Sequence, residues 1–133
     1  MPFDNSKTKV IAIPTTAGSG AESTSNAVMY INKIKHSVEG KEIRPDYFYL
    51  FPKLILSTQK KIDASSGFDA ISQAIESIFS LKSNKQSIFF ATNALKILVK
   101  NYLLFCKSKN INNSYKMQLG ANLAGKAINI SKT

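Results

Sequence analysis

The chain has 133 residues, 44% of them apolar, and carries a formal net charge of +10. This length is enough to bury one core, so one compact domain is the default expectation, and the lone Cys106 excludes an internal disulfide. Every basic residue other than Arg44 is a lysine, and the lysines are scattered, which argues against sequence-specific DNA recognition and favours a solvated basic surface.

The first 60 residues are expected to form strands and loops. An apolar run at residues 9–13 closes at Pro14 and leads into a segment rich in Thr, Ser and Gly, the pattern of a buried strand that feeds a loop. Residues 27–31 and 46–51 are further β-branched or aromatic runs bounded by turn-forming residues. We therefore place a structural boundary near residue 60.

From Asp63 onward the apolar spacing becomes helical. The first predicted helix has its apolar positions at Phe68, Ile71, Ile75, Ile78 and Phe79. Ser83 and Gln86 have the spacing of a capping box, which would start a second helix that runs to about Lys107. The apolar pattern of this second helix suggests that Cys106 is a buried, inert thiol.

A polar stretch at residues 107–113 is expected to be a loop, with a third helix from near Ser114. Small residues would form one face of this helix and let other helices approach closely: Gly120, Ala121, Ala124 and Gly125.

The sequence predicts a cytoplasmic protein without a membrane or nucleic-acid partner. No apolar stretch reaches the roughly 18 residues of a membrane span, because residues 88–106 include Asn93, Lys96, Lys100 and Asn101. Residues 1–7 lack the apolar core of a secretory signal.

Two groups of residues are candidates for chemistry. In the loop at residues 15–20, hydroxyls and exposed amides can hydrogen-bond a phosphate or a ribose, although such loops more often only connect elements. Asp69 and Gln73 are four apart on the first helix, so one metal ion can meet both side chains. The alternative for Asp69 is an aspartate that stabilises the helix dipole. His36, the only histidine, is expected at the surface.

Three blocks, at residues 13–22, 67–77 and 120–130, resemble the iron-containing alcohol dehydrogenase family, most closely members similar to phosphonoacetaldehyde reductases. The resemblance implies an α+β fragment. Residues 1–60 would be the β-rich, C-terminal end of a Rossmann-like nucleotide-binding domain, and residues 61–133 the start of an all-α metal-binding domain.

The same resemblance implies roles for particular residues. Thr15, Thr16 and Ser19 would contact NAD or NADP, and Lys35 matches a family lysine near this cofactor. Asp69 would bind Fe²⁺ or Zn²⁺, whereas Gln73 stands where the family pattern has a histidine. An amide oxygen binds such metals less well than imidazole, so Gln73 would contribute weakly, hold a water molecule or leave the site without metal. No residue is assigned as catalytic.

The resulting hypothesis is a fragment of a metal-dependent, NAD(P)-linked alcohol dehydrogenase or aldehyde reductase whose substrate is a small alcohol or aldehyde. The family's phosphate-binding glycine loop and its two further histidine ligands have no match here, so the fragment is expected to be inactive alone. One alternative is a small basic helical module that binds nucleic acid. Another is a non-catalytic partner that forms a homo-oligomer or complements an intact relative.

Overall fold

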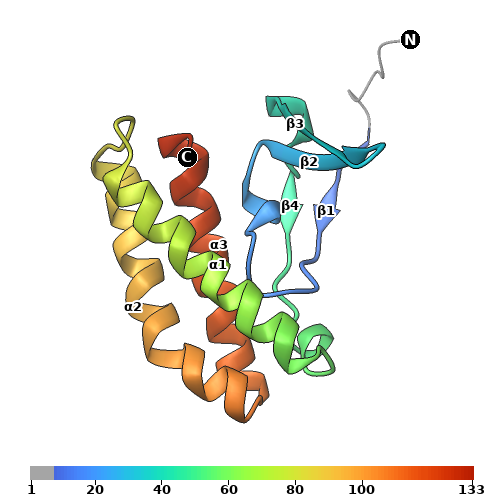
Figure 1. Ribbon diagram of the computed structural model, residues 1–133, viewed down its shortest axis with the longest axis vertical. Helices are drawn as coiled ribbons and strands as arrows, with labels where there is room; N and C mark the ends of the chain where they lie inside the picture. Colours follow the sequence, from blue (N-terminus) through green and yellow to red (C-terminus); the bar gives the residue numbers. More distant parts are fainter. Residues whose placement is uncertain (1–7) are drawn as a thin grey trace.

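The computed structural model describes residues 8–133 and places a small β region beside three long helices (Figure 1). The expectation about residues 1–7 lies outside this range. The strands are β1 (Ile11–Ala12), β2 (Asn26–Ile31), β3 (Ile34–Glu39) and β4 (Tyr47–Phe48). The helices are α1 (Lys60–Phe79), α2 (Lys85–Lys107) and α3 (Ile111–Ser131), with short 3-10 turns η1 (Ala21–Ser23), η2 (Lys41–Ile43) and η3 (Pro52–Ile55). The predicted α+β organisation, with helices from about residue 60, is confirmed.

β1 and β4 form a parallel pair and are shorter than the predicted strands at residues 9–13 and 46–51. At one end of the pair, the Asp46 carboxylate accepts a hydrogen bond from the Val10 amide at 2.9 Å. The Val10 N–H is therefore bonded to a side chain and cannot extend the backbone hydrogen bonds between the two strands. At the other end, Pro14 has no N–H to donate. The parallel pairing agrees with the predicted β-rich end of a Rossmann-like domain, whose sheet is parallel.

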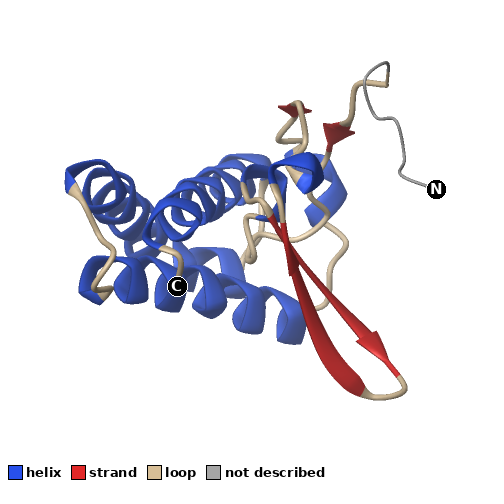
Figure 2. Cartoon of the chain, turned by 90° about the horizontal axis from the view of Figure 1, so that it is seen from above, coloured by secondary structure: helices blue, strands red, loops and turns tan. Residues whose placement is uncertain are grey.

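β2 and β3 form an antiparallel hairpin that projects away from the helices (Figure 2). β3 was not predicted, because its sequence has no apolar or β-branched run. The turn at Asn32 and Lys33 has φ values of 49° and 66°, as the favoured two-residue hairpin loops require. It was missed because neither residue is glycine.

The second and third helices begin at other residues than the sequence predicted. The capping box of α2 joins Asn84 to Ser87, with the Asn84 side chain accepting from the amides of Gln86 and Ser87. The predicted box of Ser83 with Gln86 is therefore wrong by one position. α3 starts at Ile111 behind a second box, Asn110 with Asn113, so the expected loop at residues 107–113 is shorter. In both boxes asparagine caps the helix and a short polar side chain reaches back, where glutamate or glutamine is usual.

The three helices pack through small side chains. The buried core includes Ala70 and Ala74 of α1, Ala91 and Ala94 of α2, and Ala121, Ala124 and Ala127 of α3. The predicted small-residue face of α3 is confirmed, since a Cβ on Gly120 would lie 2.6 Å from Cγ of Leu98. Phe68 and Phe79 of α1, predicted on the apolar stripe, are 61% and 81% exposed, because the buried face of α1 is instead formed by Asp63, Gly67, Ala70, Ala74 and Ser77.

α2 is the one helix within residues 8–133 that is long and apolar enough to cross a membrane by length and composition, despite the polar interruptions noted in its sequence. The core helix of a water-soluble protein passes the same test, so this is weak evidence for a membrane. α2 packs against both α1 and α3. Cys106 near its end is half-buried, not fully buried as predicted, and burial raises the pKa of its thiol.

Candidate functional site

The segment at residues 14–25, which follows β1, is held against α3 by amide side chains of that helix. Because positions four and seven apart lie on one helical face, these side chains form a row along α3. Gln118 donates to the Pro14 carbonyl at 3.1 Å, Asn122 donates to the Glu22 carboxylate at 2.9 Å, and Asn129 accepts from the Ser25 amide at 2.8 Å. The loop is therefore fixed in position by a neighbouring helix.

Glycines bring the loop into direct backbone contact with two helices. Gly20 has a φ of 58°, which glycine adopts without strain, and a Cβ there would lie 2.5 Å from the Ala121 carbonyl oxygen. A Cβ on Gly125 would lie 2.5 Å from the Gly20 oxygen. On the other side, a Cβ on Gly18 would lie 2.7 Å from Cβ of Ser66 in α1. The loop is thus wedged between α1 and α3.

Three of the four predicted cofactor residues line a cavity beside this loop. Thr15, Thr16 and Ser19 line a cavity of about 340 Å³, together with Glu22 and other residues. Ser19 also lines a second cavity, of about 530 Å³, whose wall includes Gln73 of α1. Ser19 therefore stands where the predicted cofactor loop meets the predicted metal-binding helix.

Asp69 and Gln73 are brought together as the spacing predicted. Nε2 of Gln73 donates to Oδ2 of Asp69 at 3.0 Å. Asp69 is one turn beyond Ser66, the residue that contacts the loop, so both lie on the loop-facing side of α1. Asp69 is exposed on the surface of α1, and the partial burial of its carboxyl raises its pKa above the ordinary value.

The donors present fit only part of a metal centre. Oε1 of Gln73 is buried and has no hydrogen-bond partner within the described residues, which leaves this oxygen available to a cation. Asp69 supplies a carboxylate. However, residues 8–133 contain no cluster of three or more His, Cys, Asp or Glu side chains. Two oxygen donors do not complete the site that Fe²⁺ or Zn²⁺ requires.

Two further expectations concern the hairpin. Lys35 is exposed on β3 opposite Tyr30, and it lines neither of the two cavities. The structure therefore does not bring Lys35 to the loop residues with which it was grouped. His36 is exposed, as predicted.

Sequence reasoning did not select Glu22, Gln118 or Asn122 as site residues. All three are buried, and the Asn122 side chain donates a hydrogen bond to Glu22, although the two residues are 100 positions apart in the sequence. Two signals were available: Glu22 and Asn122 both lie in blocks that resemble the family, and Gln118 and Asn122 are polar residues in or next to the small-residue face of α3.

Comparisons with known proteins identify the family of this chain. The pattern of the family described as iron-containing alcohol dehydrogenase matches residues 2–52. The aldehyde-alcohol dehydrogenase of Streptococcus pneumoniae is 30% identical over 128 residues, which cover 95% of this chain and 14% of that protein. The phosphonoacetaldehyde reductase of Streptomyces viridochromogenes is 34% identical over 93 residues, covering 67% of this chain and 23% of that protein.

Among solved structures, sulfoacetaldehyde reductase from Bifidobacterium kashiwanohense, in complex with NAD⁺, aligns with a TM-score of 0.89 and 32% identity, over 94% of this chain. The chain belongs to the iron-containing alcohol dehydrogenase family. It spans about a third (34%) of that solved relative and a smaller share of the curated relatives above. These comparisons do not favour the nucleic-acid-binding alternative.

Proposed function

We propose that this iron-containing alcohol dehydrogenase family member supplies the nicotinamide-contacting loop and one metal-binding helix of an NAD(P)-linked, metal-dependent alcohol dehydrogenase or aldehyde reductase. The observation that carries the proposal is the position of Ser19, which lines both the loop cavity and the cavity bounded by Gln73. A cofactor bound along the loop would thus lie beside the helix that bears Asp69.

Each named residue has a role in this proposal. The hydroxyls of Thr15, Thr16 and Ser19 hydrogen-bond NAD or NADP. Contacts of the loop with α1 and α3 hold these residues in place before the cofactor binds. Less conformational entropy is therefore lost on binding. Asp69 is the carboxylate ligand of Fe²⁺ or Zn²⁺ and Gln73 a weak amide ligand. These two donors are only part of a metal centre.

The reaction is hydride transfer between the cofactor and a small alcohol or aldehyde. Oxidation of the alcohol moves a hydride to the nicotinamide ring and releases one proton, and reduction of the aldehyde is the reverse. Residues 1–60 belong to the nucleotide-binding side and residues 61–133 to the metal-binding side. With so few metal donors, the 133 residues alone are expected to give no measurable turnover. The non-catalytic partner remains an untested prediction.

The first test is cofactor binding by a variant in which Thr15 and Thr16 are both replaced by valine. Valine has the shape of threonine without the hydroxyl, and a hydrogen bond contributes about 1 kcal/mol, so the double variant should bind NAD⁺ roughly tenfold or more weakly. Titration calorimetry with NAD⁺ and then NADP⁺ measures this and shows which cofactor is preferred. Thr92→Val, on α2, is the matched control. Equal affinity of the double variant and the control would contradict the proposed role of the loop.

A further inference from the structure

A separate cavity lies between the first turns of α2, the C-terminal half of α3 and the segment between η2 and β4. Its volume is about 350 Å³, and it is lined by Ser23, Arg44, Gln86, Phe90, Lys126, Asn129 and Ile130. It contains two cationic side chains and no carboxylate. It shares none of Thr15, Thr16 and Ser19 with the proposed cofactor cavity.

Lys126 is a half-buried lysine within the small-residue segment of α3. Its Nζ lies 5.2 Å from the centroid of the Phe48 ring and 5.9 Å from that of Phe90. Such cation–π contacts orient an ammonium group and stabilise it modestly, but they do not neutralise it. No carboxylate pairs with Lys126 among the ion pairs of the described residues. Its charge is therefore held at the cavity without an anionic partner.

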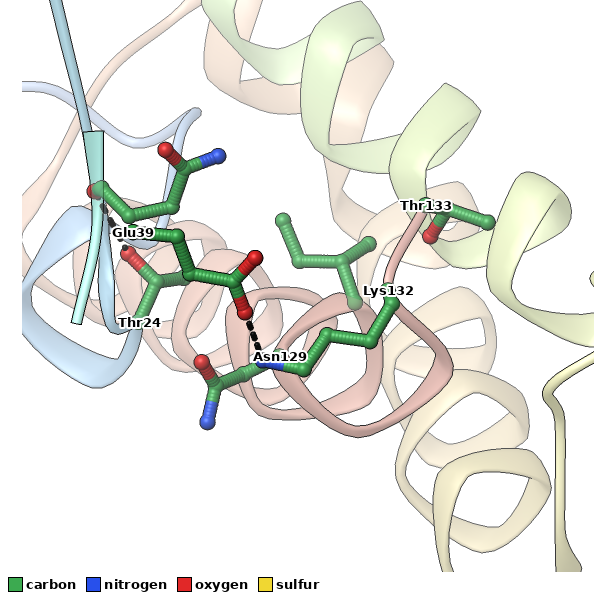
Figure 3. A pocket seen from close by; sticks show the side chains of 7 residues that line it. Thr24, Glu39, Asn129, Lys132 and Thr133 are labelled. Atoms are coloured by element: carbon green, nitrogen blue, oxygen red, sulfur yellow. Dashed lines mark hydrogen bonds and ion pairs between the residues drawn. The ribbon is translucent and has the colours of Figure 1, made fainter. Parts of the chain in front are cut away.

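Arg44, the only arginine of the chain, faces the same cavity. It also lines an adjoining cavity of about 610 Å³, together with Lys41 and Lys132. The one acid there, Glu39, is already paired with Lys132, and Figure 3 shows this pair beside Asn129. Arg44 has no such partner in residues 8–133. Its planar guanidinium can bind two oxygens of a phosphate-type group at once.

The remaining wall also favours an anion. Gln86 belongs to the first turn of α2, where the positive end of the helix dipole favours negative charge, although the amides of Gln86 and Ser87 already donate to Asn84. Asn129 uses its side-chain oxygen to accept from the Ser25 amide, which leaves its NH₂ group as a donor. Two cations that share one cavity repel each other, and an anion between them would remove that cost.

We propose that this cavity binds a phosphate-type oxyanion, namely a phosphate, phosphonate or sulfonate group, between Arg44 and Lys126. The site includes none of Thr15, Thr16 and Ser19, so the test of this site does not depend on the proposed function. The oxyanion belongs either to a nucleotide or to a small metabolite, and the two sources present the same chemistry to the cavity.

The test is calorimetric titration of the whole chain with inorganic phosphate at about 0.15 M salt, where weak surface attraction is screened. We expect one saturable site. The double variant R44Q/K126M, in which methionine keeps the packing against the phenylalanines, should bind phosphate at least roughly tenfold more weakly. The matched control K96Q/K100Q removes the same charge from an exposed part of α2, and its affinity should stay within about twofold.

Competition then identifies the source. Displacement of phosphate by ADP supports a nucleotide, and displacement by methylphosphonate alone supports a small metabolite. If the double variant does not fold, as judged by circular dichroism, R44Q alone replaces it, because Arg44 is exposed. Absence of saturable phosphate binding, or an equal loss in R44Q/K126M and K96Q/K100Q, would overturn the proposal.

Discussion

Replacing Lys109 by methionine is expected to lower the free energy of unfolding by about 3–5 kcal/mol, the usual result of removing one partner of a buried ion pair. Nζ of Lys109 lies 2.7 Å from Oδ2 of Asp63, and the two side chains are only 13% and 2% exposed. The same amine donates to the Ile55 carbonyl at 3.1 Å and to Oγ1 of Thr58 at 2.9 Å. K109M would leave the Asp63 carboxylate buried without its cation.

This cluster joins the connection between α2 and α3 to the start of α1, and therefore fixes the helix that carries Asp69. Denaturant unfolding followed by circular dichroism measures the loss, with the exposed Lys100→Met as the control. The double variant D63N/K109M should recover part of the loss because it removes the unpaired charge. A loss below about 1 kcal/mol for K109M would show that water reaches the carboxylate and that the pair behaves as a surface pair.

Gly125→Ala is expected to lower the free energy of unfolding by about 1–3 kcal/mol, as overpacking of a tight contact does, and also to weaken NAD⁺ binding. The new Cβ would lie 2.5 Å from the Gly20 carbonyl oxygen and 2.6 Å from Oγ of Ser23. The Gly20 oxygen is backbone, and the Ser23 hydroxyl is buried and bonded to that oxygen and to the Asn122 carbonyl. The loop that bears Thr15 and Thr16 must therefore move.

Gly40→Ala is the matched control for this variant. Gly40 has a φ of −177°, which any residue adopts, and its Cβ would crowd only the end of the flexible Glu42 side chain. G40A should change the free energy of unfolding by less than about 0.5 kcal/mol. Denaturant unfolding and NAD⁺ titration of G125A and G40A measure the change in stability and the change in cofactor affinity. Unchanged NAD⁺ affinity in G125A would mean that the α3 contact does not position the loop.

The elements that depend on local sequence were predictable, and those that depend on tertiary contact were not. The strand before Pro14, the three helices and the small-residue face of α3 follow from periodicity and composition. The outward position of Phe68 and Phe79 does not, because it depends on how closely α1 approaches its neighbours. β3 was missed because its sequence has no apolar run and because the turn before it contains no glycine.

The same distinction between local sequence and tertiary contact applies to the candidate site. The spacing of Asp69 and Gln73 predicted their contact, since i and i+4 are neighbours on any helix. The bond between Glu22 and Asn122 was not predictable, because it joins positions 100 apart whose proximity exists only in the folded chain. The isolation of Lys35 follows from the projection of the hairpin, which the resemblance alone did not reveal.

Paramagnetic broadening by Mn²⁺ tests most directly whether the threonine-bearing loop and the Asp69–Gln73 pair form one site. Mn²⁺ accepts carboxylate and carbonyl oxygens, and in an isotope-labelled chain it broadens the NMR signals of nearby amides. We expect joint broadening at Asp69, Gln73, Gly18 and Ser19, lost in the Asp69→Asn variant. Broadening that leaves Gly18 and Ser19 unaffected, or that persists unchanged in Asp69→Asn, would contradict the shared site.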